Sequence, residues 1–524
     1  MATTTASVIG KRKRDGRSQK AGAPKRPATQ PAQPATQAKN LFNAEPHAKV
    51  PLKDAAVQPA PITEAEPERS GSLHVQFVTG SYERVLHGVS ASIPRKLLEV
   101  PTNAVSTDTP KLEQDDKVTF ADNFLFAAHA SAIRCLAVSP PTESDKRYLA
   151  TGSTDERINV YAISTAPPSA NSKVALPTLA SNAVVENERN RSLGSLIHHE
   201  RAITRLDFPA KGKLLSSAED NTIAISRTRD WTVLSSIKAP IPKAQGRPSG
   251  DTAGPGEIPA GVNDFAIHPS QKLMLSVGRG ERCLRLWNLM TGKKAGVLNF
   301  DRALLEQVGE GKYSSGEGRR VLWDGEGETY VVGFERGAAV FGMDSKPKAI
   351  IRPAPSSKLH QLRVVQVDKQ TCLVTSTEDG RLLFFRLGAL EEGSSAEKLP
   401  SCVCVAQVGG ESTGLVGRIK DFEIMDRKDT TSDCMLAVTA SSDGAVRLWR
   451  ITSDDIAAIS AAEHNGPPKQ IGETVGTLET GSRITCLAAF RLDGANDEGA
   501  AKDSGDALDG AENGEGATSS DGGE

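Results

Sequence analysis

Short apolar segments bounded by turn residues recur along the chain between residues 72 and 492. Five of them share one spacing of three apolar positions, first seen at Ile133, Leu136 and Val138. The others are Ile203, Leu206 and Phe208; Val262, Phe265 and Ile267; Ile419, Phe422 and Ile424; and Ile484 and Leu487, with Phe490 one position late. Segments of this length and composition are typical of β-strands. We therefore predict a short strand at each.

A second pattern follows most of these strands. A Ser or Thr stands four residues before an acidic turn residue, and an aromatic residue follows six residues later, as in Thr151, Asp155 and Tyr161. The pattern returns, with some departures, at Thr375, Asp379 and Phe385; Thr439, Asp443 and Trp449; Ser216 and Asp220; and Ser276 and Trp287. Two of the turns are Asp-Gly pairs, which suit tight hairpins because these positions often need a positive φ. The pattern predicts a repeated β-hairpin.

The repeating unit has the length and strand number of a WD40 propeller blade, about 40 to 45 residues with four strands. The sequence resembles that family, although neither Trp287 nor Trp449 is followed by Asp. In the family, a His, a Ser or Thr, an Asp and a Trp form a hydrogen-bonded set that locks each blade. The resemblance gives this role to His129, Thr151, Asp155, His199, Ser216, Asp220, Trp287, Thr375, Asp379, Thr439, Asp443 and Trp449.

The predicted fold is an all-β, seven-bladed WD40 β-propeller. Six blades are expected near residues 130–198, 200–237, 262–300, 319–352, 361–408 and 417–479. The seventh is split, with three strands from 73–91 and 123–129 and its first strand from 483–490. Pairing the two ends of the folded region closes the ring and removes two exposed sheet edges. The insertions, among them 301–318 and 452–472, are rich in Pro, Gly or Ser and are predicted to be surface loops.

Charge and composition divide the chain into three regions. Residues 1–71 are a basic arm followed by a Pro-, Ala- and Gln-rich linker, and we expect this region to be disordered. Residues 72–492 form the propeller. Residues 493–524 carry ten acidic residues against Lys502 alone, which predicts a disordered acidic tail. Because 63 Lys and Arg offset 65 Asp and Glu, the whole chain is neither a polycation nor a polyanion.

The basic arm contains two clusters of cationic residues about ten residues apart. They are Lys11, Arg12, Lys13 and Arg14, followed by Lys25 and Arg26. This spacing is typical of a bipartite nuclear-import motif, so we expect an import receptor as a partner and a nuclear location. Direct binding of nucleic acid is the alternative. A mitochondrial presequence is disfavoured by the prolines and the missing apolar face.

Candidate chemistry is sparse. The seven cysteines form an odd set without paired spacing, which is typical of a reduced intracellular protein. The nine histidines show no metal-ligand spacing, and the adjacent His198 and His199 are expected to point to opposite sides of a strand. No apolar run reaches the 18 residues of a membrane helix. We expect no cofactor, no metal, no membrane contact and no enzymatic activity.

Charged residues near the first strand of each blade mark a candidate protein-binding face at the entrance of the channel. They are Arg134, Arg205, Asp264, Arg363, Arg418, Lys420 and Arg483. Their basic excess favours an acidic or RNA-containing partner, because phosphate neutralisation requires exposed Lys or Arg. The alternative is the ordinary mixture of charges on a solvated surface.

Two segments point to one subfamily of WD40 proteins. TGSYERVLHG at 79–88 and HPSQKLMLSVG at 268–278 resemble the PAK-interacting, maintenance-of-killer (Mak) type. The resemblance implies a nucleolar scaffold for assembly of the large (60S) ribosomal subunit and maturation of its rRNA. Its partners would be pre-60S assembly factors and ribosomal or ribosomal-like proteins, bound by a monomeric ring within a larger complex. Contact with pre-rRNA is left open. The alternatives are regulation of a PAK-type kinase and a role as substrate receptor of a ubiquitin ligase.

Overall fold

The structure is a computed structural model that describes eleven segments of the chain. They are residues 72–99, 117–141, 146–166, 176–177, 183–184, 189–242, 260–391, 398–415, 417–430, 432–461 and 467–492. All of them belong to one compact unit, Arg69–Glu524. The arm and linker at 1–71, with the import motif, and the tail at 493–524 lie outside the described residues, so their predicted disorder stays a prediction.

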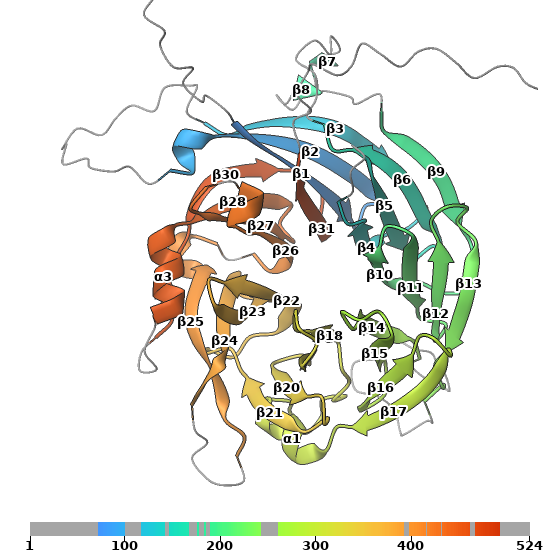
Figure 1. Cartoon of the computed structure of the whole chain (residues 1–524). Helices are drawn as coiled ribbons and strands as arrows, with labels where there is room; N and C mark the ends of the chain where they lie inside the picture. The colour runs from blue at the N-terminus through green and yellow to red at the C-terminus, as the bar shows by residue number, and fades with distance from the viewer. Residues whose placement is uncertain are drawn as a thin grey trace, which may run out of the picture. The chain divides into compact units, whose positions relative to one another are not determined.

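The described residues form an all-β structure whose sheets follow one another around a common centre (Figure 1). Four sheets contain four antiparallel strands each. The first is β4 (Ile133–Val138), β5 (Lys146–Ser153), β6 (Ile158–Ser164) and β9 (Arg191–Leu196). The second is β10 (Ile203–Ala210), β11 (Lys213–Ala218), β12 (Thr222–Arg227) and β13 (Val233–Lys238). The third is β14 (Val262–Ile267), β15 (Leu273–Gly278), β16 (Cys283–Asn288) and β17 (Lys293–Asn299). The fourth is β26 (Ile419–Met425), β27 (Met435–Ser441), β28 (Ala445–Ile451) and β30 (Glu473–Glu479).

A larger sheet combines two antiparallel groups of four strands. One group is β18 (Arg320–Trp323), β19 (Thr329–Gly333), β20 (Ala338–Gly342) and β21 (Pro347–Ile351). The other is β22 (Leu359–Val367), β23 (Gln370–Thr377), β24 (Arg381–Glu391) and β25 (Ser401–Gly409). A single parallel bridge between Ile350 and Ser401 connects the outer strands of the two groups. The short strand β29 (Lys469–Gln470) pairs with β25.

The remaining sheet unites the two ends of the folded region. Its strands are, in spatial order, β31 (Ile484–Arg491), β1 (Ser72–Ser81), β2 (Val85–Pro94), β3 (Thr119–Ala127), β8 (Ala183–Val184) and β7 (Leu176–Pro177). The pairing of β1 with β31 that the sequence leads us to expect is present, antiparallel from Val75 and Arg491 to Gly80 and Cys486. At Gly80, a Cβ atom would lie 2.7 Å from Ile133 Cγ2, so this junction needs a glycine.

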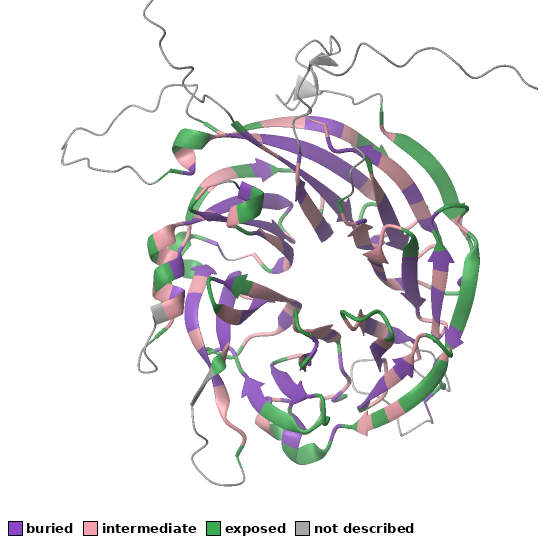
Figure 2. Ribbon diagram, viewed as in Figure 1, coloured by how far each residue is buried: buried purple, intermediate pink, exposed green. Residues whose placement is uncertain are grey.

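The core lies between adjacent sheets. Strands in the middle of each sheet, such as β11 and β15, are mostly buried, whereas strands near the centre alternate between buried and half-buried residues and the outermost strands β9, β13 and β17 are largely exposed (Figure 2). One cluster joins Phe77 and Val89 to Leu436 and Leu448 across the sheet boundary. Because strand side chains alternate between two faces, each sheet can contact both of its neighbours in this way.

Seven strands face the common centre in Figure 1, and we call them the inner strands: β4, β10, β14, β18, β22, β26 and β31. Each contacts the next in that order, and β31 contacts β4. Hydrogen bonds join the N-terminal halves of several neighbouring inner strands, which places these ends on one face of the unit. Thr485 of β31, for example, donates to the carbonyl of Ile133 on β4 at 2.6 Å.

The prediction of loops at 301–318 and 452–472 is wrong in part, because both insertions contain a helix. In α1 (Arg302–Gln307), the Asp301 side chain caps the helix by accepting from the Leu304 N–H at 2.8 Å. Before α3 (Ser453–Ala461), Thr452 and Asp455 exchange side-chain to backbone hydrogen bonds, both 3.3 Å long. Such caps satisfy the free N–H groups of a short helix, which then buries apolar residues in the core. The shorter elements are η1 (Arg95–Leu97), η3 (Glu411–Thr413) and α2 (Arg427–Thr430).

Candidate functional site

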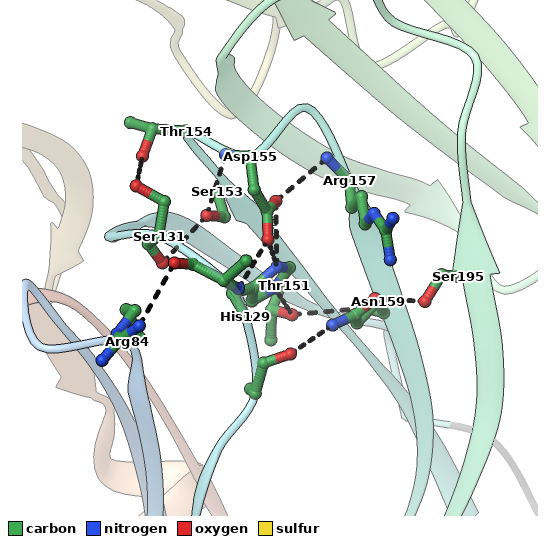
Figure 3. A network of polar contacts seen from close by, with 12 residues as sticks. Arg84, His129, Ser131, Thr151, Ser153, Thr154, Asp155, Arg157, Asn159 and Ser195 are labelled. Carbon is green, nitrogen blue, oxygen red and sulfur yellow. Dashed lines mark hydrogen bonds and ion pairs between the residues drawn. The ribbon is translucent and has the colours of Figure 1, made fainter. Parts of the chain in front are cut away.

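A predicted blade-locking set is present in the sheet that begins with β4 (Figure 3). His129 Nε2 lies 2.7 Å from the Thr151 hydroxyl oxygen, and Nδ1 lies 3.1 Å from Asp155 Oδ2. The same carboxylate accepts from the Ala130 N–H at 2.9 Å. Burial lowers the pKa of His129, although the charge of Asp155 opposes this shift. A neutral imidazole donates through one nitrogen and accepts through the other, as this geometry requires.

The next sheet contains the second set. His199 Nε2 lies 2.8 Å from the Ser216 hydroxyl, and Nδ1 lies 3.1 Å from Asp220 Oδ2. The prediction that His198 points away from His199 is wrong, because His198 Nε2 also lies 3.1 Å from Ser216 and the two rings are 4.5 Å apart. These histidines lie in the connection between β9 and β10, where the alternation of a strand does not apply.

Two tryptophans bind the strand hydroxyls without a histidine. Trp287 Nε1–H donates to the Ser276 hydroxyl at 2.8 Å, and Trp449 Nε1–H donates to the Thr439 hydroxyl at 2.9 Å. All four side chains are buried. A buried indole N–H without a partner would cost free energy, so these pairs stabilise the sheets in which they lie.

The remaining predicted members do not join such sets. The Thr375 hydroxyl is buried and has no hydrogen-bond partner among the described residues. Asp379 pairs with Arg381 at 2.6 Å and accepts from Thr377 instead. These contacts belong to the turn between β23 and β24, and Phe385, at the aromatic position, has no N–H to offer. The assignment of Thr375 and Asp379 to one locking set is therefore wrong.

Asp443 likewise has a turn role. Its carboxylate accepts from the Ala445 N–H at 2.9 Å and from Arg447 Nη2 at 3.3 Å. Neither contact reaches Thr439 or Trp449. The residue therefore shapes the hairpin between β27 and β28 rather than completing a set with these two side chains.

Several residues of the candidate protein-binding face connect the inner strands to one another. Asp264 on β14 accepts from the Val321 N–H on β18 at 3.1 Å, and Arg205 Nε on β10 lies 3.4 Å from its other oxygen. Arg320 lies 4.0 Å from the same carboxylate. The Asp264 side chain is only 3% exposed, so it links strands rather than presenting its charge to a partner.

An equivalent arrangement surrounds Asp421 on β26. Its carboxylate accepts from the Leu487 N–H on β31 at 3.0 Å and from Gln361 Nε2 on β22 at 3.1 Å. Arg363 contacts both Asp421, at 3.7 Å, and Glu423, at 2.8 Å. Burial and the charge of Asp421 raise the pKa of Glu423, and Arg363 opposes this shift. A pocket of about 370 Å³ beside these residues is lined by Arg205, Asp264, Arg363 and Glu423 among others.

Arg134 belongs to a third ionic group. Arg134 Nη1 lies 2.6 Å from Glu219 Oε1, which also lies 3.1 Å from Arg279 Nη1. These three residues come from neighbouring sheets. The Arg134 side chain is one third exposed, so it can still reach solvent.

The other predicted cations, Arg418, Lys420 and Arg483, lie at the N-terminal ends of the inner strands β26 and β31. Arg319 and Lys358 hold the equivalent place before β18 and β22, and we call these five residues the cationic rim. Burial lowers the pKa of Lys420, and the neighbouring charges of Arg418 and Arg483 lower it further. Burial also lowers the pKa of His360 to about 4, with further contributions from Lys420, Arg418, Arg320 and Arg319. The rim therefore has a positive potential.

Sequence reasoning missed several of these residues. Glu219, Glu423 and Gln361 complete the ionic groups, and Arg319 and Lys358 complete the rim. Asp264, Gln361 and Asp421 occupy the third position of their inner strands, counted from the first paired residue. Of the missed residues, only Gln361 stands at this position, and a comparison of the repeats there would have found it.

Three further features of the described residues concern metal binding, membrane contact and thiol reactivity. They contain no group of three or more His, Cys, Asp or Glu side chains placed to hold a metal ion. No helix in the described part of the chain is long and apolar enough to cross a bilayer. Burial raises the pKa of Cys135, Cys402 and Cys404 to about 12, and a protonated, buried thiol is a poor nucleophile.

Comparison with known proteins supports the repeat assignment. The family model described as WD domain, G-beta repeat, matches residues 122–161 and 190–225. These ranges contain the two histidine sets centred on His129 and His199.

Curated relatives match a much larger part of the chain. p21-activated protein kinase-interacting protein 1-like from Danio rerio is 24% identical over 80% of this chain and 81% of its own length. Protein MAK11 from Saccharomyces cerevisiae is 27% identical over 79% of this chain and 82% of its own. Shk1 kinase-binding protein 15 from Schizosaccharomyces pombe is 25% identical over 80% and 85%. The chain therefore contains WD40 repeats at 122–161 and 190–225 and is similar over about four fifths of its length to these PAK-interacting, MAK11 and Shk1-binding proteins.

Proposed function

We propose that residues 72–492 form a seven-bladed propeller closed by the pairing of β1 with β31. The seven groups of four antiparallel strands support this proposal, as do the successive contacts of the inner strands. The register of β1 against β31 supplies the joint, because it spans seven paired positions with one bulge. A closed ring leaves no wide sheet edge exposed and holds its two faces rigidly, which suits the binding of several partners at once.

We infer that this ring is a non-catalytic scaffold in nucleolar assembly of the large ribosomal subunit and maturation of its rRNA. The observation that carries the proposal is the similarity to MAK11, which extends over most of both chains. The resemblance of the sequence to the maintenance-of-killer type of WD40 protein implies this role. The partners would be pre-60S assembly factors and ribosomal or ribosomal-like proteins, with the ring acting as one monomer in the larger particle. Contact with pre-rRNA is an open part of this proposal.

Four buried polar side chains of the described sheets support a non-catalytic role, because they are committed to structural contacts. The histidines at 129 and 199 are engaged by hydroxyls and carboxylates of their own sheets. The carboxylates at 264 and 421 accept backbone N–H groups. Groups held in this way stabilise strands and are poorly placed to transfer a proton to a substrate.

We also propose that the arm directs the protein to the nucleus. Its two basic clusters, at 11–14 and 25–26, fit the two acidic grooves of an import receptor. Replacing both clusters with Ala should leave a fluorescent fusion in the cytoplasm. The matched control is Arg17→Ala/Lys20→Ala, which removes two cations from the spacer and should leave the fusion in the nucleus. Nuclear accumulation of the variant that lacks both clusters would contradict the proposal.

The scaffold role is tested by purifying a tagged chain from nuclear extract and sedimenting the complex. Large-subunit precursor RNA and assembly factors should appear in a fast-sedimenting particle. The variant Arg418→Gln/Lys420→Gln/Arg483→Gln should join this particle poorly if the rim contacts the partners. A matched control, Arg302→Gln/Lys346→Gln, changes two well-exposed cations elsewhere and should behave like the wild type. A slow-sedimenting complex without ribosomal precursors would reject the scaffold role.

A PAK-type kinase is the second candidate partner, favoured by the names of the relatives from Danio rerio and Schizosaccharomyces pombe. Pull-down of a recombinant p21-activated kinase by the purified chain tests it directly. Recovery of the kinase without ribosomal precursors would replace the first proposal with this one. A ubiquitin-ligase adaptor in the purified complex would support the third candidate, a substrate receptor.

A further inference from the structure

The cationic rim occupies one part of the face formed by the N-terminal ends of the inner strands. Four consecutive inner strands, β18, β22, β26 and β31, are each directly preceded by a basic residue: Arg319, Lys358, Arg418 and Arg483. Lys420 follows as the second residue of β26. The other three inner strands, β4, β10 and β14, are preceded by Ala132, Ala202 and Gly261. A basic residue therefore directly precedes four of the seven inner strands, whereas the cations near the start of β4 and β10, Arg134 and Arg205, are paired with Glu219 and Asp264.

The carboxylates around the rim do not neutralise it. Glu335 is shared by two cations, Arg319 at 3.0 Å and Lys358 at 2.9 Å. Glu378 lies 3.8 Å from Arg418, and both side chains are well exposed. Such exposed ion pairs contribute little free energy, so a competing anion displaces the carboxylate readily.

Two rim cations form no short ion pair among the described residues, although the charge of Glu378 acts on Lys420 from a distance. Lys420 makes no ion pair there, and the Arg483 guanidinium lies over the ring of Tyr82, 5.7 Å from its centroid. Glu83 is close, but its carboxylate accepts from the Arg483 backbone N–H at 2.9 Å. His360 Nε2, buried beside these cations, also lacks a hydrogen-bond partner in the described structure. The rim is thus a site with unmet charge.

We propose that the acidic tail of this same chain, through its distal residues 512–524, binds the cationic rim. The tail supplies the matching chemistry: ten carboxylates in 493–524, with Lys502 as the only cation and with Gly, Ala and Ser between them. An acidic segment without a fixed fold, as its composition predicts, can distribute its carboxylates over five separated cations, whereas a compact ligand cannot. Bound in this way, the tail competes with any acidic partner of the rim, whichever complex the ring joins.

The tail is long enough to reach the cationic rim from Leu492. It leaves the fold at Leu492, whose N–H donates to the His74 carbonyl at the far end of β31 from Arg483. The eight-residue strand separates the two ends by roughly 27 Å. A random coil of about 32 residues has a root-mean-square span of about 30 Å, and a fully extended chain of that length reaches roughly 110 Å. Even a path around the outer strands therefore leaves Glu512, Glu515, Asp521 and Glu524 within reach.

The first test is zero-length cross-linking of the full chain with a carbodiimide, which joins a carboxylate to a lysine amine. Lys358 and Lys420 should form intramolecular links to residues 512–524 about fivefold more often than the well-exposed Lys346, because a matched tether raises the local concentration. The excess should disappear at high salt. Equal labelling of Lys346, or links found only between two molecules, would overturn the proposal.

The second test is competition with a fluorescent hexaglutamate peptide. Replacing the seven acidic residues at 503–524 with Asn or Gln should tighten binding of this peptide about tenfold, since the tethered competitor is removed. Adding Arg418→Gln/Lys420→Gln/Arg483→Gln should abolish the binding, while Arg302→Gln/Lys346→Gln should not. Circular dichroism of each variant checks that it remains folded.

Two results of this competition would reject the proposal. Unchanged peptide affinity after tail neutralisation would show that the tail does not occupy the rim. The other result is that a labelled single-stranded RNA binds equally well with the wild-type and the neutralised tail and loses binding in the rim variant. This result would show that the rim binds RNA rather than the tail. If the protein does not join pre-ribosomal particles but its tail still binds the rim, only the proposed scaffold function is rejected.

Discussion

The side chain of Asp421 accepts a hydrogen bond from the backbone N–H of Leu487 at 3.0 Å and so joins the inner strands β26 and β31. Asp264 repeats this contact with Val321 between β14 and β18. In each case a buried carboxylate of one sheet satisfies the backbone of the following sheet. The contact fixes the relative height of two strands that are far apart in sequence.

Asp421→Ala should therefore destabilise the fold strongly. The substitution leaves the Leu487 N–H and Gln361 amide without their acceptor and Arg363 without one of its two carboxylates, which we expect to cost about 2 to 4 kcal/mol. Asp421→Asn keeps one carbonyl acceptor and should lose less. Urea unfolding followed by tryptophan fluorescence measures both. Equal stability of Asp421→Ala and the wild type would show that the contact does not hold the sheets together.

The two threonines predicted as equivalent should respond differently to removal of the hydroxyl. Thr439→Val leaves the buried Trp449 N–H unsatisfied and should cost about 1 to 2 kcal/mol. Thr375→Val removes a hydroxyl that is buried without a partner among the described residues, so stability should be unchanged or higher. Thermal unfolding of the pair provides the comparison. A larger loss for Thr375→Val than for Thr439→Val would reverse the assignment.

Gly80 should tolerate no side chain. An added Cβ would lie 2.7 Å from Ile133 Cγ2 and 2.8 Å from Cys486 Sγ, so Gly80→Ala should cost about 1 to 3 kcal/mol through overpacking at the junction of β1 and β31. Gly212→Ala is the matched control, since nothing lies within 4 Å of its added Cβ. Its free energy of unfolding should stay within about 0.5 kcal/mol of the wild type. Similar losses for both variants would indicate that the junction is loosely packed.

The free energy of unfolding should decrease as the pH is lowered, and His360 should account for part of this decrease. Burial and the surrounding cations Lys420, Arg418, Arg320 and Arg319 lower its pKa to about 4, from an ordinary value near 6.5. As the pH falls below about 6.5, the unfolded chain takes up this proton first. The stability contributed by neutral His360 is therefore present above that pH and is lost progressively toward pH 4.

His360→Gln should accordingly flatten the decrease of Tm between pH 7 and pH 5. High salt should weaken the effect in the wild type, because it screens the neighbouring cations. His198→Gln is the comparison for the pH profile. The pKa of His198 is also lowered to about 4, first by burial and then by the charge of His199, but His198 lies away from the rim cations. An unchanged pH profile of His360→Gln would rule out this contribution.

The acidic tail should be dispensable for folding, although the residues directly before it are not. Ending the chain after Leu492 keeps a buried side chain and its N–H bond to the His74 carbonyl, so Tm should fall by no more than about 2 °C, the small loss expected when a tail bound to the rim is removed. Ending it after Ala489 removes Phe490 and Leu492 from the core and should lower Tm by several degrees. A large loss of Tm in the longer truncation product would mean that the tail contributes to the fold itself.

Much of the strand pattern could be predicted from the sequence because local alternation and turn residues are enough to specify a hairpin. The inner strands at Ile133, Ile203, Val262, Ile419 and Ile484 begin where the apolar spacing places them. The histidine sets at 129 and 199 were also accessible through the resemblance to WD40 repeats, in which a His accompanies the Ser or Thr and the Asp that stand four residues apart. The helices α1 and α3 were missed because their few buried residues lie in segments dominated by loop-forming composition.

The resemblance to WD40 repeats identified the histidine sets, and the sequence by itself determined the repeated hairpins and the division of charge between the arm and the tail. These follow from interactions between residues close in sequence or from composition alone. Only the tertiary structure decided which charges meet across sheets. Arg134 pairs with Glu219, 85 residues away, and Asp264 accepts from Val321 on the next inner strand. The packing of one sheet against the next determines these partners. A charged residue that the sequence pattern predicts to be exposed can therefore be buried between two strands and bind both of them.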